Sequence, residues 1–190
     1  EVSYVINPWM EGNIGKAERT AAAGQWRALH ARLSEVAEVE LLQPQPGLPD
    51  MVFTANAAVV VGNRAVVSHF LHRERRAEEP LFRHWFKSRG FDVLELPPDL
   101  PFEGAGDALL DREGGWLWAA YGLRTELDAH PLLARWLGVE VLSLRLIDAR
   151  FYHLDTCFCP LEGGWVLWYP PAFDARSSRL IEQRVPEDKR

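Results

Sequence analysis

The sequence has few of the features that mark several common protein classes. Two cysteines among 190 residues cannot build a disulfide framework, which favours a reducing compartment. Lys and Arg number 21 against 27 Asp and Glu, and a net charge of −6 argues against a general nucleic-acid binder. No apolar run approaches the roughly 20 residues of a membrane span, and no charged-then-apolar leader opens the chain. We therefore expect a cytoplasmic protein with no nucleic-acid or membrane partner, and its homo-oligomeric state stays open.

The composition is that of a folded domain. Hydrophobic residues make up 47% of the chain and charged residues 25%, as in soluble globular proteins. This apolar content offsets the entropy of ordering the chain and excludes disorder. The length fits one ordinary domain or two small ones.

Four similar segments follow one another at a spacing of 49 residues. They begin at the aromatic residues Tyr4, Phe53, Phe102 and Phe151. After the second, third and fourth starts, two apolar runs joined by a glycine-containing turn predict a hairpin. A helix and a short strand complete the second and third copies. A strand–strand–helix–strand unit of this kind cannot bury its own apolar face, so we expect the copies to pack around a common axis.

The boundaries of these units can also be predicted. Gly90 and Gly138 follow helical patterns and are expected to end them. In the first unit, we expect a helix carrying Trp26, Leu29 and Leu33 on one face. We expect a strand at Tyr4 and another at residues 39–42, although the second hairpin strand is missing there.

Polar side chains recur near the end of the first strand of each unit. They are Asn7, Asn56, Glu103 with Asp107, and His153 with Asp155. We expect these groups to converge where neighbouring units meet. The alternative for any one of them is that it caps a turn, as Asn and Asp often do.

Two of these groups suggest a chemistry. His153 and Asp155 are two residues apart, so a strand would place both on one face. Histidine transfers protons near neutral pH, and a nearby carboxylate would fix its tautomer and raise its pKa. Glu103 and Asp107 flank small residues that allow close approach of a ligand. Two carboxylates suit a planar cation such as a guanidinium.

The cysteines and the remaining histidines are weaker candidates. On a strand, Cys157 would lie roughly 13 Å from His153, too far for a thiol–imidazole pair. We therefore interpret Cys157 and Cys159 as small hydrophobic residues. His69 and His72 lack a third ligand, so we expect no metal site and no cofactor.

These motifs together resemble the guanidino-group-modifying enzymes of the pentein, or amidinotransferase, superfamily. The resemblance implies an α/β fold, a five-bladed propeller of ββαβ units. Residues 1–190 would then form a single pentein catalytic domain with about four blades present, lacking its C-terminal blade. The motifs that carry the resemblance are Asn7-Pro8, residues 49–56, residues 75–78, residues 102–107, residues 122–125 and residues 153–156.

The resemblance also implies a mechanism. A cysteine near the family's C-terminus attacks the guanidinium carbon, and water or an amine then takes up the covalent intermediate. His153 would act as general acid and base, and Glu103 would hold the guanidinium. Arg75 and Arg124 would contact the carboxylate end of the substrate, and Asp155 the guanidinium nitrogens. The full set of expected substrate-binding residues is Asn7, Asn56, Arg75, Asp107, Arg124 and Asp155.

The sequence departs from the family pattern in two places. Deiminases and dimethylarginine hydrolases usually carry Asp where this chain has Asn56, so the resemblance points to the arginine dihydrolases. The expected nucleophile is absent, so the chain as given should bind a guanidinium without turning it over. Within the superfamily, an arginine deiminase, a dimethylarginine hydrolase or an amidinotransferase is the alternative. Outside the enzymes, it is a non-catalytic pentein like the ribosome anti-association factor.

Overall fold

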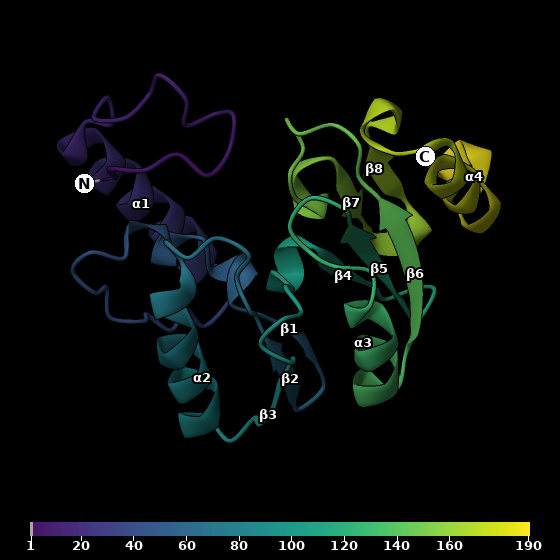
Figure 1. The fold of residues 1–190 in the computed structure, drawn as a ribbon, viewed down its shortest axis with the longest axis horizontal. Coiled ribbons are helices and arrows are strands. Elements are labelled where there is room, and N and C mark those ends of the chain that lie inside the picture. Colours follow the sequence, from purple (N-terminus) through teal and green to yellow (C-terminus); the bar gives the residue numbers. More distant parts are fainter. Residues whose placement is uncertain (1) are drawn as a thin grey trace. The chain divides into compact units, whose positions relative to one another are not determined.

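The computed structural model describes residues 2–190, which form two compact units. The first unit ends at Met51, and the second comprises Val52–Arg190. All eight labelled strands belong to the second unit (Figure 1). Within the described residues, no helix has the length and apolar content needed to cross a bilayer.

The first unit is built around a single α-helix, α1 (Arg19–Ser34). The carboxylate of Glu18 caps the helix by accepting hydrogen bonds from the backbone N–H groups of Thr20 and Ala21. The predicted helix is therefore confirmed, but its apolar face is not buried within this unit. Trp26 is 43% exposed and Leu29 is 59% exposed.

The two strands predicted in the first unit are wrong. The segment at Tyr4 and residues 39–42 have no regular secondary structure, and residues 7–15 form turns. A strand is stable only when its N–H and C=O groups pair with a neighbouring strand. Among the described residues of this unit, no hairpin strand supplies that partner.

The second unit confirms the predicted order of strands and helices. Two of its sheets consist of an antiparallel hairpin followed, after a helix, by a third strand that pairs in parallel with the second. The third sheet is a two-stranded hairpin. The strands are β1 (Ala58–Val61), β2 (Arg64–Val67), β3 (Asp92–Glu95), β4 (Ala108–Asp111), β5 (Trp116–Tyr121), β6 (Glu140–Arg145), β7 (Phe158–Pro160) and β8 (Val166–Trp168). The helices are α2 (Glu79–Ser88), α3 (Ala129–Leu137) and α4 (Ala175–Arg184).

Glycine ends α3, as predicted. Gly138 adopts a left-handed conformation with φ of 71°, and its N–H bonds to the carbonyl of Ala134. Helix α2 ends at Ser88 with Arg89 as its C-cap, and Gly90 follows with φ of 81°. Residues without a Cβ adopt such positive φ values without steric strain, which is why both helices stop at these positions.

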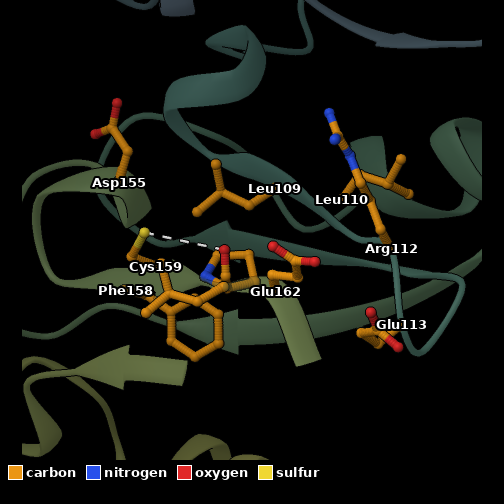
Figure 2. A pocket seen from close by; sticks show the side chains of 10 residues that line it. Leu109, Leu110, Arg112, Glu113, Asp155, Phe158, Cys159 and Glu162 are labelled. Carbon is orange, nitrogen blue, oxygen red and sulfur yellow. Dashed lines mark hydrogen bonds between the residues drawn. The ribbon is translucent and has the colours of Figure 1, made fainter. Parts of the chain in front are cut away.

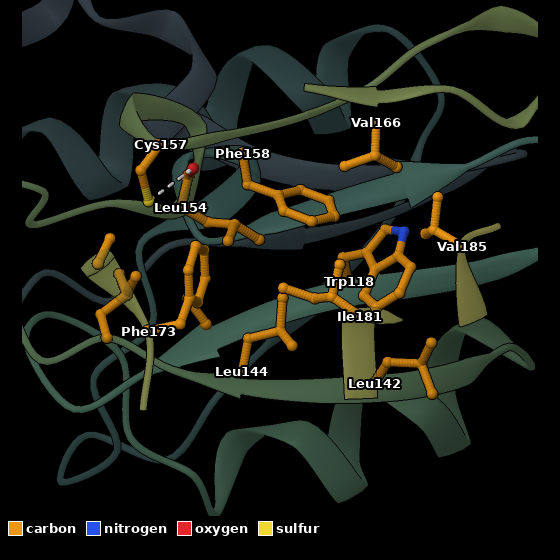
Figure 3. Close-up of a cluster of buried hydrophobic side chains, with 13 residues drawn as sticks. Trp118, Leu142, Leu144, Leu154, Cys157, Phe158, Val166, Phe173, Ile181 and Val185 are labelled. Carbon is orange, nitrogen blue, oxygen red and sulfur yellow. Dashed lines mark hydrogen bonds between the residues drawn. The ribbon is translucent and has the colours of Figure 1, made fainter. Parts of the chain in front are cut away.

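Two buried apolar clusters hold the second unit together. One is centred on Trp118 of β5, Phe158 of β7 and Ile181 of α4, which pack against one another in Figure 3. The other joins Val66 of β2 to Leu133 of α3. The clusters join elements of successive sheets, so they fix the first strand of each sheet relative to the neighbouring sheet.

Candidate active site

Three short 3-10 turns precede the first strands of the three sheets. They are η2 (Thr54–Ala57), η4 (Gly104–Gly106) and η5 (Leu154–Thr156), and they lead into β1, β4 and β7. Turn η4 contacts both η2 and η5. The repeat of the sequence thus brings equivalent turns together, and the polar residues predicted from the repeat lie on or beside them.

Glycines make this close approach of the turns possible. Gly104 has φ of 60°, and a Cβ there would lie 2.9 Å from the carbonyl oxygen of Ala55. A Cβ on Gly106 would lie 2.2 Å from Nδ2 of Asn56. Neither contact is sterically allowed, so small residues between Glu103 and Asp107 are required for the turns to meet.

His153 lies between two buried carboxylates. Its Nε2 is 3.3 Å from Oε2 of Glu103, and its Nδ1 is 3.2 Å from Oδ1 of Asp107. The Nδ1 contact has the distance of an ion pair without the alignment of a hydrogen bond. Glu103 and Asp107 are at most 1% exposed, and His153 is 4% exposed. The predicted partner of His153, Asp155, does not fill this role.

The two carboxylates are linked through Thr125, which lies 2% exposed beside them. Its hydroxyl donates to Oδ2 of Asp107 at 2.7 Å and accepts from the backbone N–H of Glu103 at 3.1 Å. The N–H of Leu154 donates to Oδ1 of Asp107 at 3.2 Å. Asp107 is therefore held on both oxygens, and Thr125 fixes its position relative to Glu103.

The carboxylate of Glu103 has two further partners. Nη1 of Arg124 lies 3.2 Å from Oε2, and the N–H of Leu71 donates to Oε1 at 3.3 Å. The guanidinium of Arg124 also lies over the ring of Tyr152, 4.8 Å from its centroid. Arg124 is 5% exposed.

Asn56 contacts both Glu103 and His153. Its Nδ2 donates to the carbonyl oxygen of Glu103 at 3.3 Å and lies 3.3 Å from Nε2 of His153. Its Oδ1 accepts from Nη1 of Arg75 at 3.0 Å. Arg75 in turn forms a buried ion pair with Glu78, with Nη2 2.8 Å from Oε2.

Asn7 and Asp155 are the other two predicted site residues. Asn7 belongs to the first unit, where its Oδ1 accepts from the N–H groups of Trp9 and Met10. This is the turn-capping arrangement that we gave as the alternative, and its role at a site stays a prediction. Asp155 is exposed on η5 and lines a hollow of about 700 Å³ with Leu109 and Cys159 (Figure 2).

The strand predicted through His153, Asp155 and Cys157 is wrong. His153 precedes the η5 turn, and the chain becomes a strand only at Phe158. The thiol of Cys157 lies 3.9 Å from the backbone carbonyl oxygen of His153. Burial raises the pKa of Cys157 to about 12, which keeps it a thiol and agrees with our interpretation of a small buried residue. Cys159 is exposed, so the same interpretation is wrong for that residue.

The electric field of the site favours a protonated His153. Burial lowers its pKa, but the carboxylates of Asp107 and Glu103 outweigh burial and raise the pKa to about 9. Burial acts to raise the pKa of Glu103, but His153, Arg124 and Arg75 outweigh it, and the pKa is lowered. Partial desolvation and the nearby carboxylate of Asp107 raise the pKa of Asp155 to about 6. The site thus pairs an imidazolium with ionised Glu103 at neutral pH.

The pKa of His153, which is raised, can be compared with that of a second buried histidine, His130, whose pKa is lowered. We expect deuterium exchange at the imidazole C2 position to give a midpoint near 9 for His153. The midpoint of His130 should fall below its ordinary 6.5, because burial lowers its pKa. Since the folded pKa of His153 exceeds the unfolded value, its stabilisation is complete below pH 6.5 and is lost as pH rises through about 9. A midpoint for His153 at or below that of His130 would contradict the geometry described.

Among residues 2–190, no group of three or more His, Cys, Asp and Glu side chains is arranged to hold a metal ion. His69 and His72 do not lie on a helix, because His69 pairs with Phe102 in an isolated antiparallel β-bridge and His72 lies in a bend. Nδ1 of His69 lies 3.3 Å from Glu79.

Two residues of this cluster were not predicted as site residues. Thr125 directly follows Arg124 in one of the motifs, and this adjacency to a predicted site residue is the signal that could have identified it. Glu78 lies three residues after Arg75, a spacing at which two side chains meet on a helical turn. Both signals are common on protein surfaces, and neither reveals burial.

Buried carboxylates around an imidazolium, beside a guanidinium and an oriented amide, are suited to chemistry on a planar cation. This arrangement is the one that the resemblance to guanidino-group-modifying enzymes leads us to expect. A sequence model of the family described as "N,N dimethylarginine dimethylhydrolase, eukaryotic" matches residues 11–177. The chain belongs to this family.

Individual relatives agree with this assignment. The bifunctional arginine dihydrolase/ornithine cyclodeaminase ArgZ of Synechocystis sp. is 64% identical over 190 residues, all of this chain and 27% of that protein. The N(G),N(G)-dimethylarginine dimethylaminohydrolase of Mycobacterium tuberculosis is 37% identical over 187 residues, which cover 98% of this chain and 60% of that protein. The resemblance to guanidino-modifying enzymes, and to arginine dihydrolases among them, is confirmed.

Solved structures support the same fold. The cyanobacterial ArgZ apo structure superposes with a TM-score of 0.98 at 64% identity, over 100% of this chain and 29% of that chain. An adduct of a dimethylarginine dimethylaminohydrolase shares the fold at 21% identity, with a TM-score of 0.67 over 78% of this chain and 60% of that chain. The chain spans about a quarter of the length of the bifunctional relatives.

Proposed function

We propose that this chain is the guanidino-binding part of a hydrolase that removes both terminal nitrogens of arginine as ammonia. The observation that carries the proposal is the Asn56 amide, which lies 3.3 Å from His153 and bonds to the Glu103 carbonyl. Relatives of 64% and 65% identity are described as arginine dihydrolases.

Each side chain of the cluster would have a separate role in binding or proton transfer. Glu103 would bind the guanidinium and stabilise its charge, and Asp155 would contact the guanidinium nitrogens from the rim of the hollow. His153, protonated at neutral pH, would give a proton to the leaving ammonia and then accept one from the attacking water. Asp107 would hold the imidazolium. We propose that the rest of the substrate is bound by Arg75, Arg124 and Asn7.

The nucleophile is proposed to be a cysteine outside this chain. Cys157 is buried with a raised pKa, which opposes thiolate formation. An ArgZ structure with bound substrate was solved as a cysteine-to-serine variant, which supports a reacting cysteine in that relative. This chain by itself would then bind the guanidino group without turning it over.

Two hydrolytic rounds are proposed at the same carbon. In the first, arginine and one water give the ureido compound citrulline and ammonia. In the second, the ureido carbon and another water give ornithine, carbon dioxide and ammonia. An amide at position 56 can donate to the ureido oxygen in the second round, which a carboxylate cannot do.

We also propose that the complete domain is a five-bladed ββαβ propeller, of which this chain supplies about four blades. Two complete ββα–β units and one further hairpin in the second unit support this arrangement. The single catalytic domain at residues 1–190 and the cytoplasmic location stay predictions.

A dimethylarginine hydrolase is the second candidate. The family match and the 37% identical mycobacterial relative favour it. It would release a methylated amine and citrulline, because only one C–N bond is broken. The buried charged cluster opposes a non-catalytic binding protein, which has no need to desolvate four ionisable side chains.

The products formed from arginine by the complete protein test the proposal. Two ammonia molecules per ornithine would support the dihydrolase. One ammonia per citrulline would replace it with a deiminase, and turnover of dimethylarginine alone would favour the second candidate.

The Thr125 hydroxyl offers a test of the carboxylate network. We expect Thr125→Val to lower kcat of the complete protein for arginine by about tenfold or more. This factor corresponds to the free energy of one buried hydrogen bond to a charged group. Thr125→Ser keeps the hydroxyl and should stay within about threefold of the wild type. Equal rates for the two variants would show that the bridge between Glu103 and Asp107 has no catalytic role.

A further inference from the structure

Arg75 and Glu78 form a buried ion pair beside Asn56. Arg75 is 3% exposed and Glu78 is 0% exposed. Nε of Arg75 lies 3.2 Å from each carboxylate oxygen of Glu78, and Nη2 lies 2.8 Å from Oε2. Several simultaneous hydrogen bonds of this kind fix a guanidinium in both position and plane.

The opposite edge of the Arg75 guanidinium faces Asn56. Nη1 donates to Oδ1 of Asn56 at 3.0 Å, and the ring of Phe70 covers the guanidinium at 4.2 Å from its centroid. An Arg side chain has donors only, so it selects the oxygen of the amide. The Nδ2 group of Asn56 is thereby turned toward His153 and the carbonyl of Glu103.

Two groups compete for the Asn56 oxygen. A protonated His153 would attract Oδ1, because both nitrogens of an imidazolium are donors. Arg75 attracts the same atom from the other side. Without a fixed Arg75, the amide can turn over and present its oxygen to the imidazolium, and the site then lacks the Nδ2 donor.

Glu78 decides this competition, because it holds Arg75 at Asn56. If Glu78 were neutral, Arg75 would lose the ion pair and the charged hydrogen bonds that fix its guanidinium. Glu103 is an anion close enough for Arg75 to lower its pKa. Arg75 would be drawn toward it and away from Asn56.

We propose that Glu78 is a positioning residue that controls how many nitrogens are removed, because it keeps the Asn56 amide donating toward the reacting carbon. This inference rests on the proposed dihydrolase function. It predicts an effect on the second hydrolytic round, in which the ureido oxygen needs a donor, that is larger than the effect on the first.

The test compares product ratios in the complete protein given arginine. We expect Glu78→Gln to lower the ratio of ornithine to citrulline at least about tenfold, the equivalent of one misplaced hydrogen bond. The control is Ile181→Ala, which truncates a buried apolar side chain of α4 and should leave the ratio unchanged. A loss of stability alone would lower the total rate of both variants without changing the ratio.

A second variant covers the case in which Glu78→Gln does not fold. The double change Arg75→Gln/Glu78→Gln buries no unpaired charge, and it should give the same fall in ratio because a glutamine at position 75 can accept as well as donate. If the wild type makes ornithine and two ammonia and these variants do too, the positioning role of Glu78 is wrong while the proposed function stands. If the wild type stops at citrulline, the proposed function itself fails.

Discussion

Changing Glu103→Gln is expected to lower kcat/KM of the complete protein for arginine by at least about a thousandfold. The carboxylate is fully buried and faces His153, Arg124 and the N–H of Leu71. An amide keeps the shape but removes the negative charge that would bind a guanidinium. It also removes one of the charges that keep His153 protonated, so the proton donor is weakened as well.

The matched control for this change is Glu140→Gln. Glu140 is an exposed carboxylate at the start of β6 and forms an ion pair with Arg184. Its replacement should leave kcat/KM within about twofold, as for most surface substitutions. If Glu103→Gln keeps activity within about tenfold of the wild type while Glu140→Gln does too, Glu103 is not part of the reacting site.

Changing Asn56→Asp is expected to make citrulline the main product in place of ornithine. Asp can still accept from Arg75 and can bind a guanidinium, so the first hydrolysis should continue. It cannot donate to the ureido oxygen, and its charge would raise the pKa of His153 further above 9. Both effects slow the second hydrolysis, and citrulline leaves first. Amino-acid analysis of the products at several times measures the change.

Asn63→Asp serves as the control for this substitution. The substitution replaces the same amide with a carboxylate, but on the exposed turn between β1 and β2. There, Nδ2 of Asn63 donates to the carbonyl of Gly90. Ornithine should stay the product there. If Asn56→Asp also yields ornithine with two ammonia, the amide at position 56 does not determine the outcome.

Much of the second unit follows from local signals in the sequence. The apolar runs around Gly62 and Gly115 predict hairpins, because a residue without a Cβ can adopt the positive φ of each turn. The 49-residue spacing from Phe53 to Phe102 to Phe151 also predicts that their polar followers lie on equivalent turns. The structure brings Asn56, Glu103 and His153 together on that basis.

The partners within the site could not be predicted in the same way. The sequence places Asp155 two residues from His153, but the η5 turn directs the two side chains apart, and Asp107 from the preceding repeat takes the contact. Short helical turns and strands have similar local sequence requirements, so the choice depends on tertiary packing. Thr125 was missed because a hydroxyl has no sequence pattern that reports its burial.

The first unit shows the limit of a repeat argument. Residues 39–42 match the closing strands of later units in composition, yet they form no strand. A strand forms only when it is hydrogen-bonded to a neighbouring strand, and the residue pattern of one segment does not show whether that neighbour is present. The helix α1, in contrast, needs only its own backbone, and it was predicted correctly.

The fate of the guanidino carbon tests the central claim most directly. The complete protein would be given arginine labelled with ¹³C at that carbon, and the label followed by NMR through a full conversion. We expect the signal to move to carbon dioxide and bicarbonate, with free citrulline never exceeding a small fraction of the arginine consumed. A label that stays in the ureido carbon of citrulline after all the arginine is consumed would contradict this expectation.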